Sequence, residues 1–152
     1  MAKKRLTVSL NPKVLLQVNR VHIGQNKLVY VLLTDKKLKY PWGRTSVVYI
    51  GTTKKGLARV ASSAAYRAEE ILSQYGVRTC SARVITCKRR PNVQTWRKLE
   101  RAMLLSFREM YGTVPKFNSQ GKRIAERDEF DYFTRSRIRQ ILRDLTESPD
   151  GS

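Results

Sequence analysis

Three short runs of β-branched and aromatic residues predict three buried strands. The runs cover residues 28–33, 47–51 and 77–87, the last with its core at 82–86. Runs of this length and composition are typical of strands that pack on at least one face. The segment 34–46 between the first two runs is polar and basic and contains Pro41 and Gly43. It therefore predicts a long connection rather than more strand.

Four other segments repeat apolar residues every three or four positions, as amphipathic helices do. The strongest patterns cover an alanine-rich stretch at 56–74 and a second stretch at 95–111, which end at Gly76 and Gly112. A last helix is predicted from about residue 121, or later, to residue 145. A shorter helix is predicted to begin at Ser9 to Pro12, with an apolar stripe made of Val14, Leu15 and Val18.

These elements predict the α+β class, with a small, mostly antiparallel three-stranded sheet flanked by helices. The chain has 152 residues, of which 41% are hydrophobic, and this is enough for one domain with a real core. The expected organisation is a basic N-terminal extension over 1–26, a core over 27–120, a C-terminal helix over 121–147 packed on that core, and a tail over 148–152.

Positive charge is concentrated in the first 125 residues, which hold 26 lysines and arginines against five acids. The remaining residues hold five arginines against seven acids. A domain with this much self-repulsion is typical of proteins that bind a polyanion, usually nucleic acid. An anionic membrane is a weaker candidate, because no segment joins a long apolar face to a basic one. No apolar run reaches the roughly 18 residues of a membrane span.

Cysteine and histidine are too scarce for most metal or thiol chemistry. Cys80 and Cys87 are too few for a disulfide framework, and His22 is the only histidine, so no zinc motif can be assembled. A Ser-His or Cys-His pair would have to use His22. The basic start is not followed by the apolar stretch of a signal peptide. The protein is expected to be soluble and intracellular, in the cytoplasm or associated with the nucleoid.

Glu100 stands on the apolar face of the helix predicted at 95–111. Trp96, Met103 and Phe107 lie four residues before it, three after it and seven after it, so the four side chains share one face. A carboxylate that points inward needs a cation. A salt bridge to an arginine is the commoner case and a divalent metal ion is the other.

A polar stripe interrupts the alanine-rich helix at positions i, i+3, i+4 and i+7. Its members are Arg59, Ser62, Ser63 and Tyr66. Arg59 lies in the first turn, where anions are favoured, and a guanidinium can hold a phosphate with paired hydrogen bonds. An exposed surface arginine is the alternative interpretation.

Five landmarks along residues 27–120 resemble the GIY-YIG nucleases. Leu28-Val29-Tyr30 and Tyr49-Ile50-Gly51 are similar to the paired tripeptides that name this family. Arg59 follows Tyr49 by ten residues, Glu100 lies on a later helix, and the segment from Gly112 to Asn118 is similar to the loop that carries the family's asparagine. Two positions depart from the family: Leu28 replaces its glycine, and Ser63 stands where members often carry histidine or tyrosine, a role that Tyr66 could take.

The resemblance implies a divalent-metal-dependent DNA endonuclease that hydrolyses phosphodiester bonds and uses no small-molecule cofactor. It assigns Glu100 to one Mg²⁺ or Mn²⁺ per active site, Arg59 to the scissile phosphate, Tyr30 to the proton of the attacking water, Tyr49 to orienting that water, and Asn118 to organising the site. Tyrosine has a pKa near 10, so nearby cations are expected to lower the pKa of the tyrosine that acts as a base.

Further DNA contacts are expected on the 34–46 connection, which is longer than the family's usual hairpin, and on the stretch that follows the second strand. The candidates are Lys36, Lys37, Lys39, Trp42, Arg44, Lys54, Lys55, Ser63 and Tyr66; the two lysines at 54 and 55 could equally be solvated. Two alternatives stay open: a non-catalytic binding module for DNA or RNA, and a basic structural protein of a ribonucleoprotein particle. A structure with Glu100 far from Tyr30 and Arg59 would favour the first.

Overall fold

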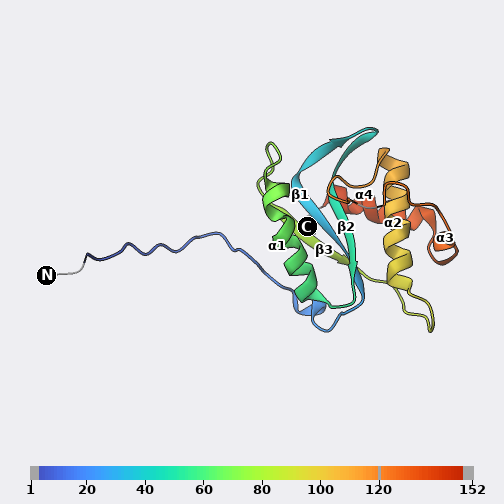
Figure 1. Ribbon diagram of the computed structural model, residues 1–152, viewed down its shortest axis with the longest axis horizontal. Helices are drawn as coiled ribbons and strands as arrows, with labels where there is room; N and C mark the ends of the chain where they lie inside the picture. Colours follow the sequence, from blue (N-terminus) through green and yellow to red (C-terminus); the bar gives the residue numbers. More distant parts are fainter. Residues whose placement is uncertain (1–3, 120, 149–152) are drawn as a thin grey trace.

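The computed structural model describes residues 4–119 and 121–148. In these residues a short 3-10 helix is followed by three strands and four α-helices. Figure 1 labels the strands and the α-helices. The elements are η1 (Arg20–His22), β1 (Leu28–Tyr40), β2 (Gly43–Thr53), α1 (Leu57–Leu72), β3 (Cys80–Ile85), α2 (Thr95–Tyr111), α3 (Glu129–Tyr132) and α4 (Arg135–Glu147).

The three strands form one antiparallel sheet in the order β2-β1-β3. The predicted α+β class with a three-stranded antiparallel sheet is therefore confirmed. The predicted long connection at 34–46 is wrong, because β1 and β2 continue through it and leave only Pro41 and Trp42 between them. Polar residues there alternate with Leu38 and Tyr40, which turn inward. The Tyr40 hydroxyl donates to the Val47 carbonyl over 2.9 Å and holds the two long strands together.

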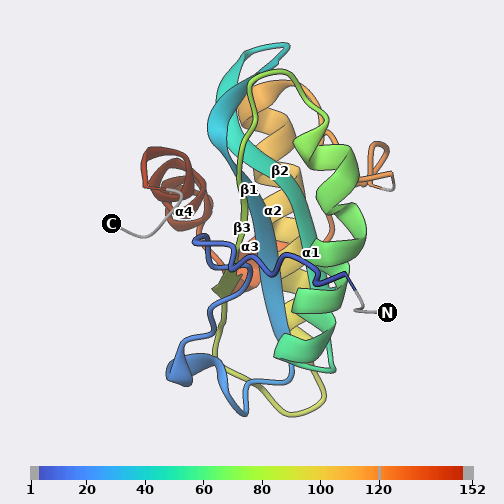
Figure 2. The ribbon, with the colours of Figure 1, turned by 90° about the vertical axis from the view of Figure 1, so that its left-hand side faces the viewer.

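Alternate residues of β1 pack against different helices on the two faces of the sheet. Val29, Val31 and Leu33 face the core formed with α2 and α4, whereas the even-numbered residues Leu28, Tyr30 and Leu32 face α1. Figure 2 shows α1 and α4 on opposite sides of the sheet. This arrangement leaves β2 at one edge of the sheet, between α1 on one face and α2 on the other.

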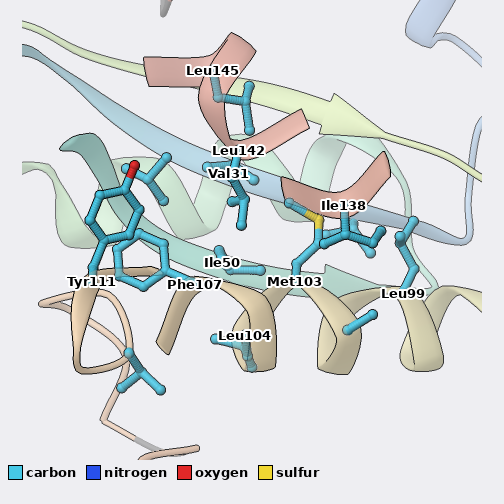
Figure 3. Packing of buried hydrophobic residues seen from close by; sticks show 14 of the residues in the cluster. Val31, Ile50, Leu99, Met103, Leu104, Phe107, Tyr111, Ile138, Leu142 and Leu145 are labelled. Carbon is cyan, nitrogen blue, oxygen red and sulfur yellow. The ribbon is translucent and has the colours of Figure 1, made fainter. Parts of the chain in front are cut away.

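The prediction for α2 is confirmed residue for residue. Its inward face carries Leu99, Met103 and Phe107, which pack against β1, β2 and α4 (Figure 3). The helix ends where Gly112 adopts a left-handed conformation with φ of 87°, a common helix stop that glycine allows at little cost. Glu100 lies on α2 beside Leu99, Met103 and Phe107, and it therefore lies near the β2 edge of the sheet.

Two helix predictions are wrong. Residues 9–18 form no helix, and Figure 1 shows this N-terminal segment leading away from the body of the molecule. Its apolar stripe has no core to pack on, so propensity alone does not make a helix there. The single last helix is instead α3 and α4, because Phe133 is extended and Thr134 caps a new helix by accepting a bond from the Arg137 backbone N–H. In the described residues, none of the helices is both long and apolar enough to cross a membrane.

Candidate active site

A cleft of about 1260 Å³ lies along the β2 edge of the sheet. Residues from β2, α1, α2 and α3 line it, together with the connections that precede α2 and α3. The charged and polar side chains that line it are Tyr49, Arg67, Asn92, Gln94, Arg97, Lys98, Glu100, Arg101, Asn118, Ser119, Arg123, Arg127, Asp128, Glu129 and Tyr132. The cleft therefore brings together three residues that the sequence singled out: Tyr49, Glu100 and Asn118.

A hydrogen-bond network connects α1 to the two tyrosines of the sheet. The Tyr30 hydroxyl is hydrogen-bonded to the Ser63 hydroxyl over 2.7 Å. Arg67 donates from Nη1 to the same Ser63 oxygen over 2.8 Å and from Nη2 to the Tyr49 hydroxyl over 3.1 Å. Its guanidinium also lies 4.0 Å from the centre of the Tyr49 ring. Arg67 is thus held on two sides at the wall of the cleft.

Gly51 makes room for the tyrosine pair. It lies opposite Tyr30 in the sheet, and the ring centres of Tyr30 and Tyr49 are 5.8 Å apart. A Cβ atom at Gly51 would come within 2.7 Å of both rings. Only glycine therefore fits here without moving the tyrosines. The need is for space, not for a special backbone conformation.

Tyr49 is a neutral phenol at neutral pH. Burial raises its pKa to about 12, the nearby Tyr30 adds to the shift, and Arg67 opposes it. At Tyr49 the loss of hydration outweighs the attraction of the one guanidinium of Arg67. Tyr49 therefore acts here as a hydrogen-bonding group.

Glu100 is half-buried in the cleft and has no salt-bridge partner in the described part of the chain. Burial raises the pKa of its carboxyl, and Arg97 and Arg101 oppose that shift only from a distance. The salt-bridge interpretation of Glu100 is therefore wrong for the described residues. Its charge is also felt at Tyr49, where it contributes to the raised pKa.

The buried salt bridge of this cleft belongs to a different glutamate. Glu129 of α3 is only 1% exposed and accepts a bond from Arg101 Nε over 2.6 Å. Its other carboxylate oxygen accepts from the backbone N–H of Arg127 over 2.8 Å. Arg101 thus turns away from Glu100, its neighbour in sequence, toward the better enclosed carboxylate. In the sequence Glu129 is one of seven acids in residues 126–152, and nothing in the pattern distinguishes it from the others.

Asn118 ties the connection after α2 to the free edge of β2. Its Oδ1 accepts from the Ile50 N–H over 3.0 Å, and its Nδ2 donates to the Ile50 carbonyl over 2.9 Å. The side chain takes the place of a neighbouring strand next to Tyr49. This geometry supports the organising role expected for Asn118.

Other predicted site residues lie outside the cleft. Arg59 is exposed in the first turn of α1, Tyr30 is buried behind Tyr49, and Tyr66 is 85% exposed. Ser63, at the position where the family often has histidine or tyrosine, contacts Tyr30 and Arg67, and the ring centre of Tyr66 lies 5.9 Å from the Arg67 guanidinium. The candidate DNA contacts outside the cleft are exposed on the β1–β2 hairpin or before α1: Lys36, Lys37, Lys39, Arg44, Lys54 and Lys55.

None of the five arginines that line the cleft was predicted from the sequence. Arg101 is paired, and the other four have no carboxylate within salt-bridge distance among the described residues: Arg67, Arg97, Arg123 and Arg127. The other cations of the cleft, Lys98 and Arg101, are paired with Asp128 and Glu129. Among the described residues the cleft therefore holds four unpaired guanidinium groups against one unpaired carboxylate, that of Glu100, which is an excess of three positive charges. Only Arg67 could have been found from the sequence, because it follows Ser63 by one helical turn and so continues the polar stripe of that helix.

The resemblance implies a divalent metal ion, and Glu100 is the side chain that fits it. In the described residues, no three His, Cys, Asp or Glu side chains come together as a ready-made ligand set. A site with one carboxylate suits Mg²⁺, which keeps several waters and takes other oxygens from a bound phosphate. A half-buried carboxylate with no ion pair in the described structure meets that requirement.

Comparison of the chain with protein-family models, with curated proteins and with solved structures gives no match.

Proposed function

We propose that this protein is a divalent-metal-dependent endonuclease that hydrolyses phosphodiester bonds of DNA in the cleft beside β2. The observation that carries the proposal is the unpaired carboxylate of Glu100 in a cleft that also holds the Tyr49–Arg67 pair and an excess of arginines. Arginine clusters suit phosphate, because each guanidinium offers several donors in a fixed plane. A lone carboxylate among them repels a phosphate unless a cation lies between the two.

In this mechanism Arg67 and Tyr49 act as one unit on the substrate. Arg67 donates to the Tyr49 oxygen, so the phenol proton is free to be donated to a phosphate oxygen or to direct a water. Arg67 retains further N–H groups for the negative charge that grows on the phosphate in the transition state. Asn118 fixes the Tyr49 segment of β2 through its two bonds to Ile50.

Tyr49 could act as a base only after losing its own proton to become a phenolate. Its pKa of about 12 lies roughly five units above neutral pH, so forming the phenolate there costs about 7 kcal/mol. Tyr30, which the resemblance makes the proton acceptor, is buried and hydrogen-bonded to Ser63. Both observations support a positioning role for Tyr30 in this proposal. A divalent ion held by Glu100 would supply the Lewis acidity that lowers the pKa of the attacking water and stabilises the leaving oxygen.

DNA binding is expected to fall steeply as salt rises and to need no metal. The first 125 residues carry a formal charge of +21, and the phosphates that the protein contacts release counterions on binding. Anisotropy titrations of a labelled duplex in EDTA, from low to physiological salt, measure this effect. An affinity that stays flat across the series would contradict the electrostatic account.

Arg67→Ala is expected to lower the single-turnover cleavage rate by about 10²-fold or more, the usual loss for one preorganised transition-state donor. Arg59→Ala serves as the matched control, because it removes an arginine from the same helix outside the cleft. We expect that control to weaken binding slightly and to keep the cleavage rate. A larger rate loss for Arg59→Ala than for Arg67→Ala would return the phosphate-binding role to Arg59.

The function itself is tested by incubating the purified protein with supercoiled plasmid in Mg²⁺, in Mn²⁺ and in EDTA. Nicked or linear product in either metal, and none in EDTA, is the expected result. Tight binding without cleavage in both metals would favour the non-catalytic nucleic-acid-binding protein instead.

A further inference from the structure

A second cavity adjoins the cleft at the start of α2. It has a volume of about 700 Å³ and is lined by Lys27, Arg89, Arg90, Pro91, Asn92, Val93, Gln94 and Trp96. The turn from Asn92 to Gln94 lines the cleft as well, so one short segment forms the boundary of both spaces. A ligand that lies along this turn can therefore reach from the cleft into the second cavity.

All charged side chains that line the second cavity are cationic. Lys27, Arg89 and Arg90 are exposed, and its lining contains no acid. Lys27 Nζ lies 4.7 Å from the centre of the Trp96 ring, and the Arg90 guanidinium lies 5.4 Å from the ring of Tyr132. Tyr132 is itself part of the cleft wall, so Arg90 stands between the two spaces. None of the three cations has a salt bridge in the described residues.

The start of α2 adds the positive end of a helix dipole and one buried side-chain donor to this cavity. Gln94 caps this helix without a side-chain hydrogen bond, and no acid lies in its first turn. The positive end of the helix dipole is therefore uncompensated and attracts anions. Trp96, in that first turn, is 7% exposed, and its indole nitrogen is buried without a hydrogen-bond partner among the described residues. Buried donors are normally paired, and Trp96 is one of the residues that line this cavity.

We propose that this cavity is a second phosphate subsite, which holds a neighbouring phosphate of the same nucleic-acid strand that occupies the cleft. The inference rests on the proposed function in one respect: the cleft must bind nucleic acid. Continuity through the turn from Asn92 to Gln94 favours a strand over a free phosphate, because a strand places anions in both spaces at once. The protein should therefore need substrate that extends beyond the phosphate held in the cleft.

The first test compares the affinity for long and short duplexes in EDTA, where no cleavage occurs. The double variant Arg89→Ala/Arg90→Ala removes two cations from the subsite. Arg137→Ala/Arg143→Ala is the matched control, since both residues are exposed on α4 and line neither space. For a long duplex we expect the subsite variant to lose about tenfold more affinity than the control and to reduce the salt slope by about two. For a short duplex the two variants should behave alike.

The second test uses the fluorescence of Trp96. Trp42 is 69% exposed on the hairpin, so Trp42→Phe leaves Trp96 as the only tryptophan of the chain. A shift of its emission with the long duplex, and none with inorganic phosphate or the short duplex, is expected. A shift with inorganic phosphate alone would overturn the assignment to a strand and indicate a free-anion site.

The outcomes separate this inference from the proposed function. If the long duplex distinguishes the subsite variant from the control and no cleavage is found, the subsite stands and the endonuclease does not. If plasmid is cleaved and the two double variants bind alike, the subsite is overturned and the endonuclease stands. Failure to bind any nucleic acid overturns both.

Discussion

Replacing Glu100 by glutamine is expected to abolish metal-dependent cleavage while the fold and the DNA affinity are kept. An amide oxygen is a poorer ligand for Mg²⁺ than a carboxylate, so metal affinity in the protein–DNA complex should fall in parallel. DNA affinity in EDTA should stay equal or rise, because a negative charge leaves the phosphate site. Single-turnover cleavage and anisotropy measure the two effects.

The same variant should melt at the wild-type temperature or above it. Burial raises the pKa of Glu100, so in the folded protein this carboxyl binds protons more readily than in the unfolded chain. The ionised carboxylate therefore destabilises the fold at neutral pH, and glutamine removes that penalty. Wild-type stability should fall as pH rises from the ordinary value of 4.5 through the raised pKa. The advantage of the variant should be full above this window and vanish below it.

Glu109→Gln is the matched control, because Glu109 lies on the same helix and pairs with Arg135 and Arg139 away from the cleft. It makes the same change of charge and should leave cleavage unchanged. Strong destabilisation of Glu100→Gln would contradict the claim that the Glu100 carboxylate is unpaired. Normal cleavage by Glu100→Gln would contradict the claim that α2 contributes to the active site.

Glu129→Gln is expected to destabilise the protein by about 2–3 kcal/mol. Removing one partner of a buried ion pair costs roughly 3–5 kcal/mol, and the partial exposure of Arg101, together with the remaining amide oxygen, reduces that cost. For a chain of this size the loss corresponds to a fall of roughly 5–10 °C in melting temperature. Calorimetry or thermal circular dichroism measures it.

The pair of glutamates makes this a sharp comparison. Glu100 and Glu129 line the same cleft, yet the first should affect cleavage without lowering stability and the second should lower stability. At temperatures where the Glu129→Gln variant is folded, its cleavage per folded molecule should remain within a few-fold of wild type. Equal melting temperatures for wild type and Glu129→Gln would show that the contact with Arg101 contributes little.

The sequence predicted elements that depend on local pattern. The helix α2 was found to the residue, because apolar periodicity and the stop at Gly112 agree. Of the five residues expected to form one site, Tyr49, Glu100 and Asn118 line the cleft, and the other two, Tyr30 and Arg59, do not line it. Their chemical roles stay predictions until the variants are measured.

Other features depend on contacts between distant segments, which one sequence does not contain. The β1–β2 hairpin extends through a polar stretch because Tyr40 bonds to Val47 and to the backbone N–H of Lys116. Arg101 pairs with Glu129 and not with Glu100 because α3 packs against α2 and brings Glu129 within 2.6 Å. The position of Arg67 at the cleft depends on the Ser63 and Tyr49 hydroxyls that hold it. The resemblance to the GIY-YIG nucleases instead gave the phosphate-binding role to Arg59, which follows Tyr49 by ten residues.

The central claim is tested most directly by one single-turnover assay on an end-labelled DNA duplex, with wild type and Glu100→Gln purified side by side and each measured with and without Mg²⁺. The account predicts that wild type cuts the duplex only in Mg²⁺ and that Glu100→Gln binds it equally well and leaves it intact. Equal cleavage by both proteins, or cleavage by wild type in EDTA, would contradict it.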